Sequence, residues 1–221
     1  MTDRVASTER LFMDPRARCV LDFWFGDTVT NPAAIHVRGA FWFGHEGEAP
    51  EAAAARDELI RASFGELVEE ASDGRLAHWA DDPHERLALI ILLDQFRRNI
   101  HRGTAAAFSR DALALELTRS GLHAGMDRQL APIERAFFLM PLQHAESLEA
   151  QEESLRAFTE LESDAPPAAA EAFKEFKEYA RQHYDVVRRF GRFPHRNAAL
   201  RRPPTAAEVR YLAGDASTFG Q

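Results

Sequence analysis

Residues 84–100 read HERLALIILLDQFRRNI, and this stretch decides the fold class. From Leu87 to Leu93 the apolar side chains would point to almost every side of a helix, which is typical of a helix buried at the centre of a protein. Before it, Asp82 and Pro83 provide an N-cap and a first helical residue, and Glu85 stands where it would complete a capping box. The stretch therefore predicts a central helix that begins at Pro83.

On both sides of this helix, the chain repeats the same signals for the start and the end of a helix. Asp14-Pro15 and Asn31-Pro32 are helix starts, and Gly26 and Gly44 are the matching ends. Further helices are expected over 51–72, from Thr104 to an end marked by Gly121 and Gly125, from Pro132 to Pro141, and over 145–161, 168–190 and 205–212. No hairpin turn flanked by alternating apolar residues is visible. We predict a single all-α domain over 1–221, with about eight helices in antiparallel hairpins and flexible ends at 1–13 and 213–221.

Composition excludes several classes of protein. The chain has 221 residues, of which 45% are hydrophobic and 28% charged, and its net charge of −8 opposes nucleic-acid binding. No apolar run reaches the about 18 residues that a membrane span needs. The single cysteine, Cys19, rules out an intrachain disulfide, suits a reducing cytoplasm, and is expected to be a small buried residue. Metal and nucleotide motifs such as HExxH and GxGxxG are missing, so neither a metal nor a cofactor is predicted.

Polar residues stand next to strongly apolar ones in four places, and burying each of them unpaired would cost about 1–3 kcal/mol. The four clusters contain Asp94, Arg98, Asn99 and Arg102; Glu134 and Arg135; His144 and Glu146; and Arg192, His195, Arg196 and Asn197. Each also has a purely structural explanation. The first two suit the charged ends of helices, a lone histidine is often a structural residue, and the basic segment 188–197 could dock onto the acidic helix 145–161.

Three functions stay open at this point. In the first, the chain binds an anionic small molecule or peptide through arginine forks. The ligand-binding residues would then be Asp94, Arg98, Asn99, Arg102, Arg135, Arg192, Arg196 and Asn197. In the second, it is a metal-independent hydrolase or lyase, with His144 or His195 as general base and Glu134 or Glu146 as its orienting carboxylate. In the third, the clusters are paired helix ends and the protein is a scaffold or a homodimer.

Several segments taken together resemble a known family. They are VLDFWFG (20–26), LLDQFRRNIHRGTAAAF (92–108), ERAFFLMPLQHAE (134–146) and RFGRFPHRNAAL (189–200). They are similar to a bacterial domain-of-unknown-function family whose members are about as long as this chain. The resemblance implies an all-helical fold, a right-handed tetratricopeptide-like array, and it marks residues of all four clusters without giving any of them a role. Two positions depart from the family pattern, because Arg97 replaces a proline and Gln143 replaces a glutamate.

Overall fold

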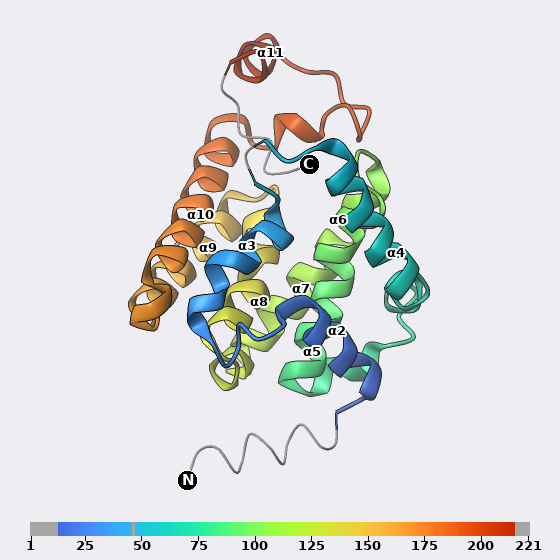
Figure 1. Ribbon diagram of the computed structural model, residues 1–221. Helices are drawn as coiled ribbons and strands as arrows, with labels where there is room; N and C mark the ends of the chain where they lie inside the picture. The colour runs from blue at the N-terminus through green and yellow to red at the C-terminus, as the bar shows by residue number, and fades with distance from the viewer. Residues whose placement is uncertain (1–12, 46, 215–221) are drawn as a thin grey trace.

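The expected central helix is present, and the other helices surround it (Figure 1). The computed structural model describes residues 13–45 and 47–214. In it, residues 83–100 form one continuous rod made of α5 (Pro83–Ile90), a π-helical turn (Ile91–Phe96) and α6 (Arg97–Ile100). Every side chain from Leu87 to Leu93 is at most 4% exposed. The all-round apolar pattern therefore predicted the position of this helix correctly.

The start of α5 is capped in a different way from the one predicted. The carboxylate of Asp82 accepts hydrogen bonds from the backbone N–H groups of His84 and Glu85, as expected of an N-cap. Glu85 does not complete a capping box on Asp82. Its Oε1 instead accepts a hydrogen bond of 2.7 Å from the backbone N–H of Asp14, which is itself the N-cap of α2 (Pro15–Phe25). This bond ties the beginnings of α2 and α5 together.

The remaining helices follow the predicted order. They are α3 (Ile35–Phe43), α4 (Pro50–Ser72), α7 (Asp111–His123), α8 (Pro132–His144), α9 (Leu148–Ser163), α10 (Ala170–Phe190) and α11 (Ala206–Leu212). Short 3₁₀ segments at 32–34, 77–81, 105–108, 126–129, 167–169 and 194–196 join them. The described ranges contain no strand, which confirms the all-α class. The helices α9 and α10 pack along each other as an antiparallel hairpin (Figure 1), whereas the tetratricopeptide-like array stays a prediction.

Two helices run past a residue that was expected to end them, although Gly125, the second end signal expected for α7, does follow its last residues in a left-handed conformation. Gly121 lies inside α7 because packing requires a glycine there: a Cβ at this position would lie 2.5 Å from Cζ of Phe138. Pro141 lies inside α8, which continues to His144. A proline inside a helix removes one backbone hydrogen bond, but every residue of α8 from Ile133 to His144 is buried, so packing holds the last turn in place. His144 is therefore the last residue of a helix.

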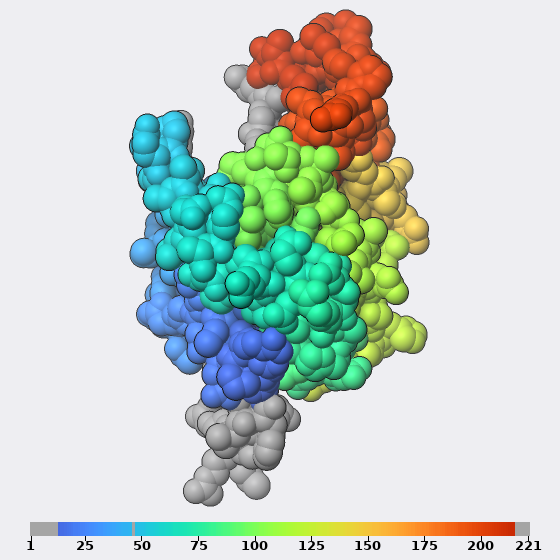
Figure 2. Space-filling model, turned by 90° about the vertical axis from the view of Figure 1, so that its right-hand side faces the viewer, coloured from blue at the N-terminus to red at the C-terminus, as the bar shows by residue number. Residues whose placement is uncertain are grey.

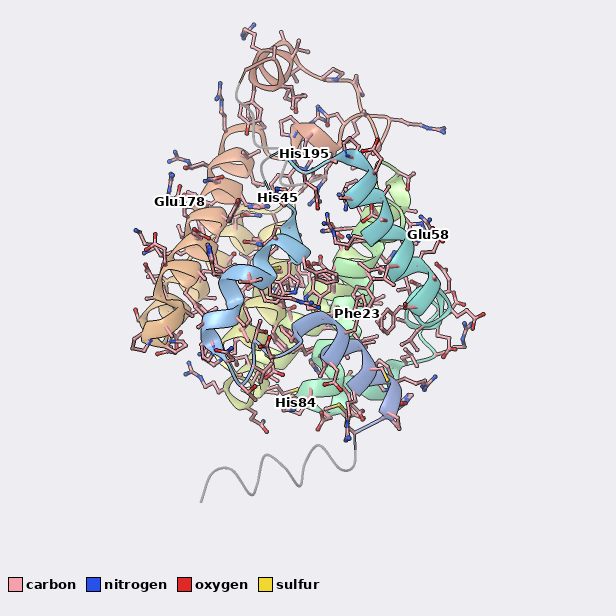
Figure 3. All side chains as sticks on the ribbon, in the orientation of Figure 1. Phe23, His45, Glu58, His84, Glu178 and His195 are labelled. Carbon is pink, nitrogen blue, oxygen red and sulfur yellow. The ribbon has the colours of Figure 1, made fainter. Side chains whose placement is uncertain are left out.

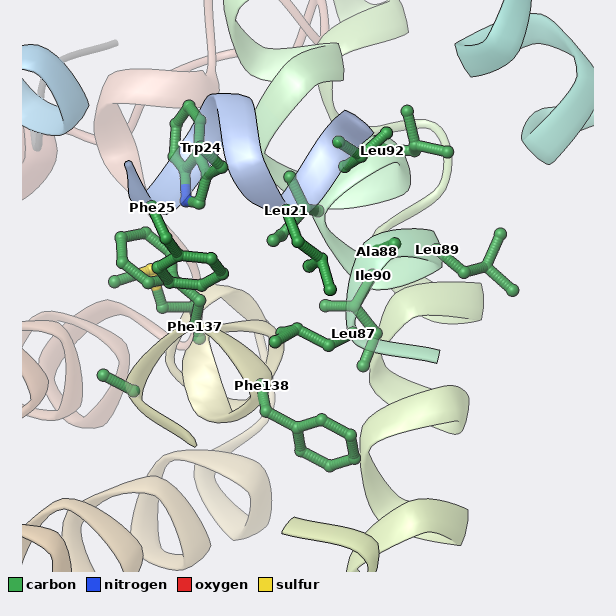
Figure 4. Packing of buried hydrophobic residues seen from close by; sticks show 14 of the residues in the cluster. Leu21, Trp24, Phe25, Leu87, Ala88, Leu89, Ile90, Leu92, Phe137 and Phe138 are labelled. Carbon is green, nitrogen blue, oxygen red and sulfur yellow. The ribbon is translucent and has the colours of Figure 1, made fainter. Parts of the chain in front are cut away.

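The core is built where α2 meets α5 and α8. Figure 4 shows Trp24 and Phe25 of α2 beside Phe137 of α8, and the ring centroids of Trp24 and Phe137 are 5.5 Å apart. Cys19, on the same helix α2, is exposed, so the prediction that it is buried was wrong. It lies on the face of α2 that turns away from this core. Residues 1–12 and 215–221, which make up most of the two ends expected to be flexible, lie outside the described residues.

Gly121→Ala is expected to destabilise the protein by about 1–3 kcal/mol, because its methyl group would force Phe138 and Arg86 to move. Gly39→Ala is the matched control. Gly39 also lies inside a helix, α3, but a Cβ there would meet nothing within 4 Å. That variant should gain up to about 1 kcal/mol from the higher helix propensity of alanine. Urea denaturation of both variants measures the difference, and equal effects would show that the contact with Phe138 does not decide the residue at 121.

Candidate functional site

The centre of the candidate site is Asp94, which lies in the π-helical turn between α5 and α6. Its side chain is completely buried. Oδ1 lies 2.8 Å from Nδ1 of His144 and 3.1 Å from Nη2 of Arg98, and Oδ2 accepts a hydrogen bond of 2.5 Å from Nε2 of Gln95. Single turns of π-helix often mark functional positions in helices. Asp94 thus connects the central rod to the end of α8.

The contact with Asp94 determines the proton position on His144. A carboxylate only accepts hydrogen bonds, so Nδ1 of His144 carries the hydrogen and Nε2 has the lone pair. Burial lowers the pKa of His144, which keeps the imidazole neutral near pH 7. Burial alone would raise the pKa of Asp94, but Arg98 and His144 outweigh it and hold that pKa well below its usual range. The pair therefore presents a neutral, fixed imidazole with a free acceptor atom, as a general base requires.

A second carboxylate, Asp111 at the start of α7, joins two arginines of different clusters. Arg98 binds it in a bidentate manner, with distances of 3.0 Å from Nη1 to Oδ1 and 3.1 Å from Nη2 to Oδ2. Nη1 of Arg196 lies 3.1 Å from Oδ2 of the same carboxylate. The first, third and fourth sequence clusters therefore meet at one place, through Asp94, Asp111 and their arginine partners.

Arg196 is the least compensated cation of this group. It is only 4% exposed, and its Cζ lies 4.6 Å from the ring centroid of Phe108 and 4.5 Å from that of Phe193. Its ion pair with Asp111 uses Nη1, while Nε is buried and donates to no atom of the described residues. Burial, with repulsion from Arg98, lowers the pKa of Arg196 to about 10. This guanidinium is charged at pH 7 and only partly neutralised.

Two further histidines lie beside it. The ring centroids of His144 and His183 are 5.9 Å apart, and Phe193 packs against both His183 and His195 at 5.5 Å. Nδ1 of His183 donates to the backbone carbonyl of Tyr179 at 2.7 Å. Burial lowers the pKa of His183 well below its usual value and that of His195 to about 3. Figure 3 shows His195 at the end of the molecule where α10 ends and α4 begins.

Glu146 fixes the segment that carries Arg196. It accepts a hydrogen bond of 2.7 Å from the backbone N–H of Phe193 and two from Arg202, at 2.6 and 2.9 Å. Arg202 also donates from Nε to Oδ1 of Asn197 at 3.0 Å. Nδ2 of Asn197 is buried without a partner among the described residues. Glu146 therefore holds the turn at 193–197 against the end of α8. The carboxylate that orients His144 is that of Asp94.

Five of the predicted site residues lie in ion pairs or hydrogen bonds outside this centre. Asn99 and Arg102 both bind Asp57 of α4, at 2.8 Å and 2.6 Å. Glu134 accepts a hydrogen bond from the backbone N–H of Ala131 and caps α8, ten residues or about 15 Å from His144 along the helix. Arg135 pairs with Asp164 at 3.0 Å, and Arg192 pairs with Glu208 at 2.6 Å. These contacts join helices to one another.

The sequence did not single out two residues of the centre, Asp111 and His183. His183 had a weak signal, because Phe176 precedes it by seven residues just as Phe137 precedes His144. In the structure, α8 and α10 place these residues next to each other: the ring centroids of Phe137 and Phe176 lie 6.4 Å apart, and His144 and His183 lie side by side. Asp111 had no local signal beyond its place at a helix start.

The two departures from the family pattern lie next to the centre. Arg97 donates to the hydroxyls of Ser72 and Ser109 and to the carbonyl of Ala106, so it holds the segment that carries Phe108 against the end of α4. Gln143 is buried beside His144, and its backbone carbonyl accepts from Gln151 at 2.6 Å. Neither residue offers an acid or base at the site.

Among residues 13–45 and 47–214, no three His, Cys, Asp or Glu side chains are grouped as a metal ion would need. No helix in the same ranges is long and apolar enough to cross a membrane. Figure 2 shows the start of α4 and the segment 190–212 rising at the same end of the molecule, with the segment that follows α6 between them. The residues of the centre come from this end.

Fold and site together define an all-helical protein in which an Asp–His pair and two arginines are buried where four helices end or begin. The chain belongs to the bacterial proteins of unknown function called DUF924, whose family model matches residues 20–215. It is similar to the structure of a protein of unknown function from Agrobacterium tumefaciens, with 32% identity and a TM-score of 0.65. That match covers 83% of this chain and 98% of the other. No curated protein matches the sequence. The family resemblance expected from the motifs is confirmed.

Proposed function

We propose that this protein binds a small anionic molecule at Arg196. The observation that carries the proposal is the one-sided pairing of this buried guanidinium: Nη1 reaches Asp111, and the buried Nε has no partner among the described residues. Burying a cation without full compensation is costly, and a bound anion would remove that cost. Buried polar groups without a partner are uncommon in native structures, so the pairing of Arg196 calls for an explanation.

The other arginines of the sequence hypothesis contribute less to such a site. Arg98 is bound by both Asp94 and Asp111, so it holds these two carboxylates in place and its charge is used by them. Arg102, Arg135 and Arg192 each have a carboxylate partner outside the centre. The clamp of several arginines expected from the sequence is therefore reduced to one ligand-facing cation. His144, with its free Nε2, and the buried amide of Asn197 would supply hydrogen bonds to the bound molecule.

Arg196→Gln is expected to abolish the thermal stabilisation that anionic metabolites give to the protein. A screen of small anions at constant ionic strength, read as a shift of Tm, measures it, since a ligand that binds only the folded state raises Tm. Arg188→Gln is the matched control, because it removes the same charge from an exposed arginine whose partner is Asp185. If no anion raises the Tm of the native protein, or if both variants respond alike, the proposal is wrong.

The contact of 2.8 Å between Asp94 and His144 favours a second function, that of a metal-independent hydrolase or lyase. In this function His144 takes a proton from water or substrate on Nε2, Asp94 stabilises the imidazolium that forms, and Arg196 stabilises negative charge on the substrate. A panel of ester, amide and hydroxy-acid substrates tests it. Loss of general-base catalysis in His144→Gln should lower kcat about 10²–10⁴-fold, whereas His123→Gln, on an exposed histidine, should not.

The scaffold or homodimer, the cytoplasmic location and the absence of nucleic-acid partners stay predictions from the sequence. The ion pairs of Arg102, Arg135 and Arg192 favour a structural role for those residues. They leave the centre without such an explanation, since Nε of Arg98, Nε of Arg196 and Nδ2 of Asn197 are buried without a partner among the described residues. The binding function therefore has more support than the scaffold function.

A further inference from the structure

The surroundings of Arg196 restrict the kind of anion that can bind. Resting on the function proposed above, we propose that the ligand is a carboxylate, a planar monoanion that lies in the plane of the Arg196 guanidinium between Phe108 and Phe193. Three features of the site support this choice. They are the two rings at the guanidinium, the edge of Arg196 that stays unpaired, and the charges of the neighbouring side chains.

Two phenylalanine rings lie against the guanidinium of Arg196. Their centroids lie 4.6 Å and 4.5 Å from its Cζ, within the range of cation–π contacts. In the proposed arrangement, Phe108 and Phe193 cover the two faces of the guanidinium. A ligand can therefore reach Arg196 only along the edges of its plane.

One of those edges is already used and another is open. Nη1 binds Oδ2 of Asp111 at 3.1 Å. The side edge of the guanidinium, formed by Nε and Nη2, has two parallel N–H groups that match the two oxygens of a carboxylate. Nε is buried and has no acceptor among the described residues, and no hydrogen bond of Nη2 is present there either. This edge is the place where a carboxylate would bind with two parallel hydrogen bonds.

The shape of the site favours a planar group. A carboxylate bound side-on is coplanar with the guanidinium and extends between the same two rings. A phosphate or sulfate bound by two oxygens must direct its remaining oxygens above and below that plane. Those oxygens would meet the faces of Phe108 and Phe193, which carry the negative part of the aromatic quadrupole. Tetrahedral anions are therefore disfavoured both sterically and electrostatically.

The charge of the site favours a single negative charge. Arg98 contacts both Asp94 and Asp111, whereas Arg196 has only the carboxylate of Asp111, which it shares with Arg98, and Glu146 is neutralised by Arg202. The three histidines nearby add no positive charge, because burial keeps them neutral. A monoanion would complete the pairing of Arg196. A second negative charge would meet three carboxylates and no additional cation.

The Nε–H resonance of Arg196, assigned by its loss in Arg196→Lys, provides a test in the intact protein. Acetate, its neutral isostere acetamide, and inorganic phosphate near pH 8 are titrated separately at constant ionic strength. We expect acetate to shift this resonance until it saturates with one acetate bound per chain, and acetamide to leave it unchanged. Phosphate should bind at least about tenfold more weakly than acetate. Arg196→Lys keeps the charge and loses the two-donor edge, so its Tm should rise less with acetate, whereas Arg188→Lys should behave as the native protein.

The outcomes separate this inference from the function it rests on. If phosphate shifts the Arg196 resonance as strongly as acetate does, the site binds anions but the choice of a planar monoanion is wrong. If no probe shifts it, both proposals fail. Phe108→Leu adds a check that does not depend on Arg196 itself: removing one aromatic wall should narrow the preference for acetate over phosphate. An unchanged preference would overturn the argument from shape.

Discussion

Asp94→Asn is expected to lower the free energy of unfolding by about 3–5 kcal/mol, the usual cost of removing one partner from a buried ion pair. The substitution keeps the size of the side chain and removes its charge. Asp111 would then be the only carboxylate facing both Arg98 and Arg196. Since Arg98 is buried with it, the surplus positive charge could not be screened by water. Denaturation by urea, monitored by circular dichroism, measures the loss.

Asp185→Asn is the control for this result. Asp185 also pairs with two arginines, Arg181 and Arg188, but on the exposed surface of α10. Exposed pairs contribute about 0–1 kcal/mol, so this variant should be close to the native protein in stability. A similar, small effect of both substitutions would mean that Asp94 is not an essential counter-charge, and the site as described would lose its centre.

Helix positions were predictable because their signals are local. Asp14, Asp82 and Thr205 cap the helices that follow them, as the sequence indicated, and Thr205 forms its capping box with Glu208. The two residues that were wrongly expected to end helices, Gly121 and Pro141, are held inside them by contacts with other helices. In the sequence, a glycine that is needed for the close approach of Phe138 cannot be distinguished from a glycine that ends a helix. Local propensity cannot separate the two cases.

The site was predictable in part, for a related reason. Polar residues in apolar surroundings indicated that Asp94, His144 and Arg196 need partners, and the structure brings them to one place. The identity of those partners was not predictable. Asp94 and His144 are 50 residues apart, and Asp111 and Arg196 are 85 residues apart, so no spacing rule connects them. Arg135 and Arg192 have the same residue type as Arg196, and only the fold shows that their charges are used elsewhere.

Acidification is expected to destabilise this protein strongly, starting near pH 6.5, because three histidines are buried in the neutral form. Burial lowers the pKa values of His144, His183 and His195 in the folded chain, whereas the unfolded chain takes up these protons near pH 6.5. The unfolded state therefore binds more protons below that pH, and the free energy of unfolding falls as the pH is lowered. Above pH 6.5 this stabilisation is fully present.

The size of the effect follows from the number of protons. Each histidine that stays neutral contributes about 1.4 kcal/mol per pH unit below pH 6.5, so three histidines that all stay neutral would together contribute about 4 kcal/mol per unit. Asp94, whose pKa is lowered in the folded state, adds to the loss only below about pH 4. Urea denaturation at several pH values between about 7 and 5 gives the slope. A flat profile over this range would show that the histidines take up protons without unfolding.

His195→Asn provides the sharpest version of this test. The pKa of His195 is lowered to about 3, so its contribution to the slope should extend over the whole range from pH 6.5 downward. Replacing it should reduce the slope by one proton, whereas His123→Asn, on an exposed side chain of α7, should leave the slope as it is. Protonation of a histidine beside Arg196 would add a positive charge near the anion site, so acetate should bind more tightly as the pH is lowered. The affinity for acetate, measured in the native protein at several pH values down to the onset of unfolding, tests this expectation.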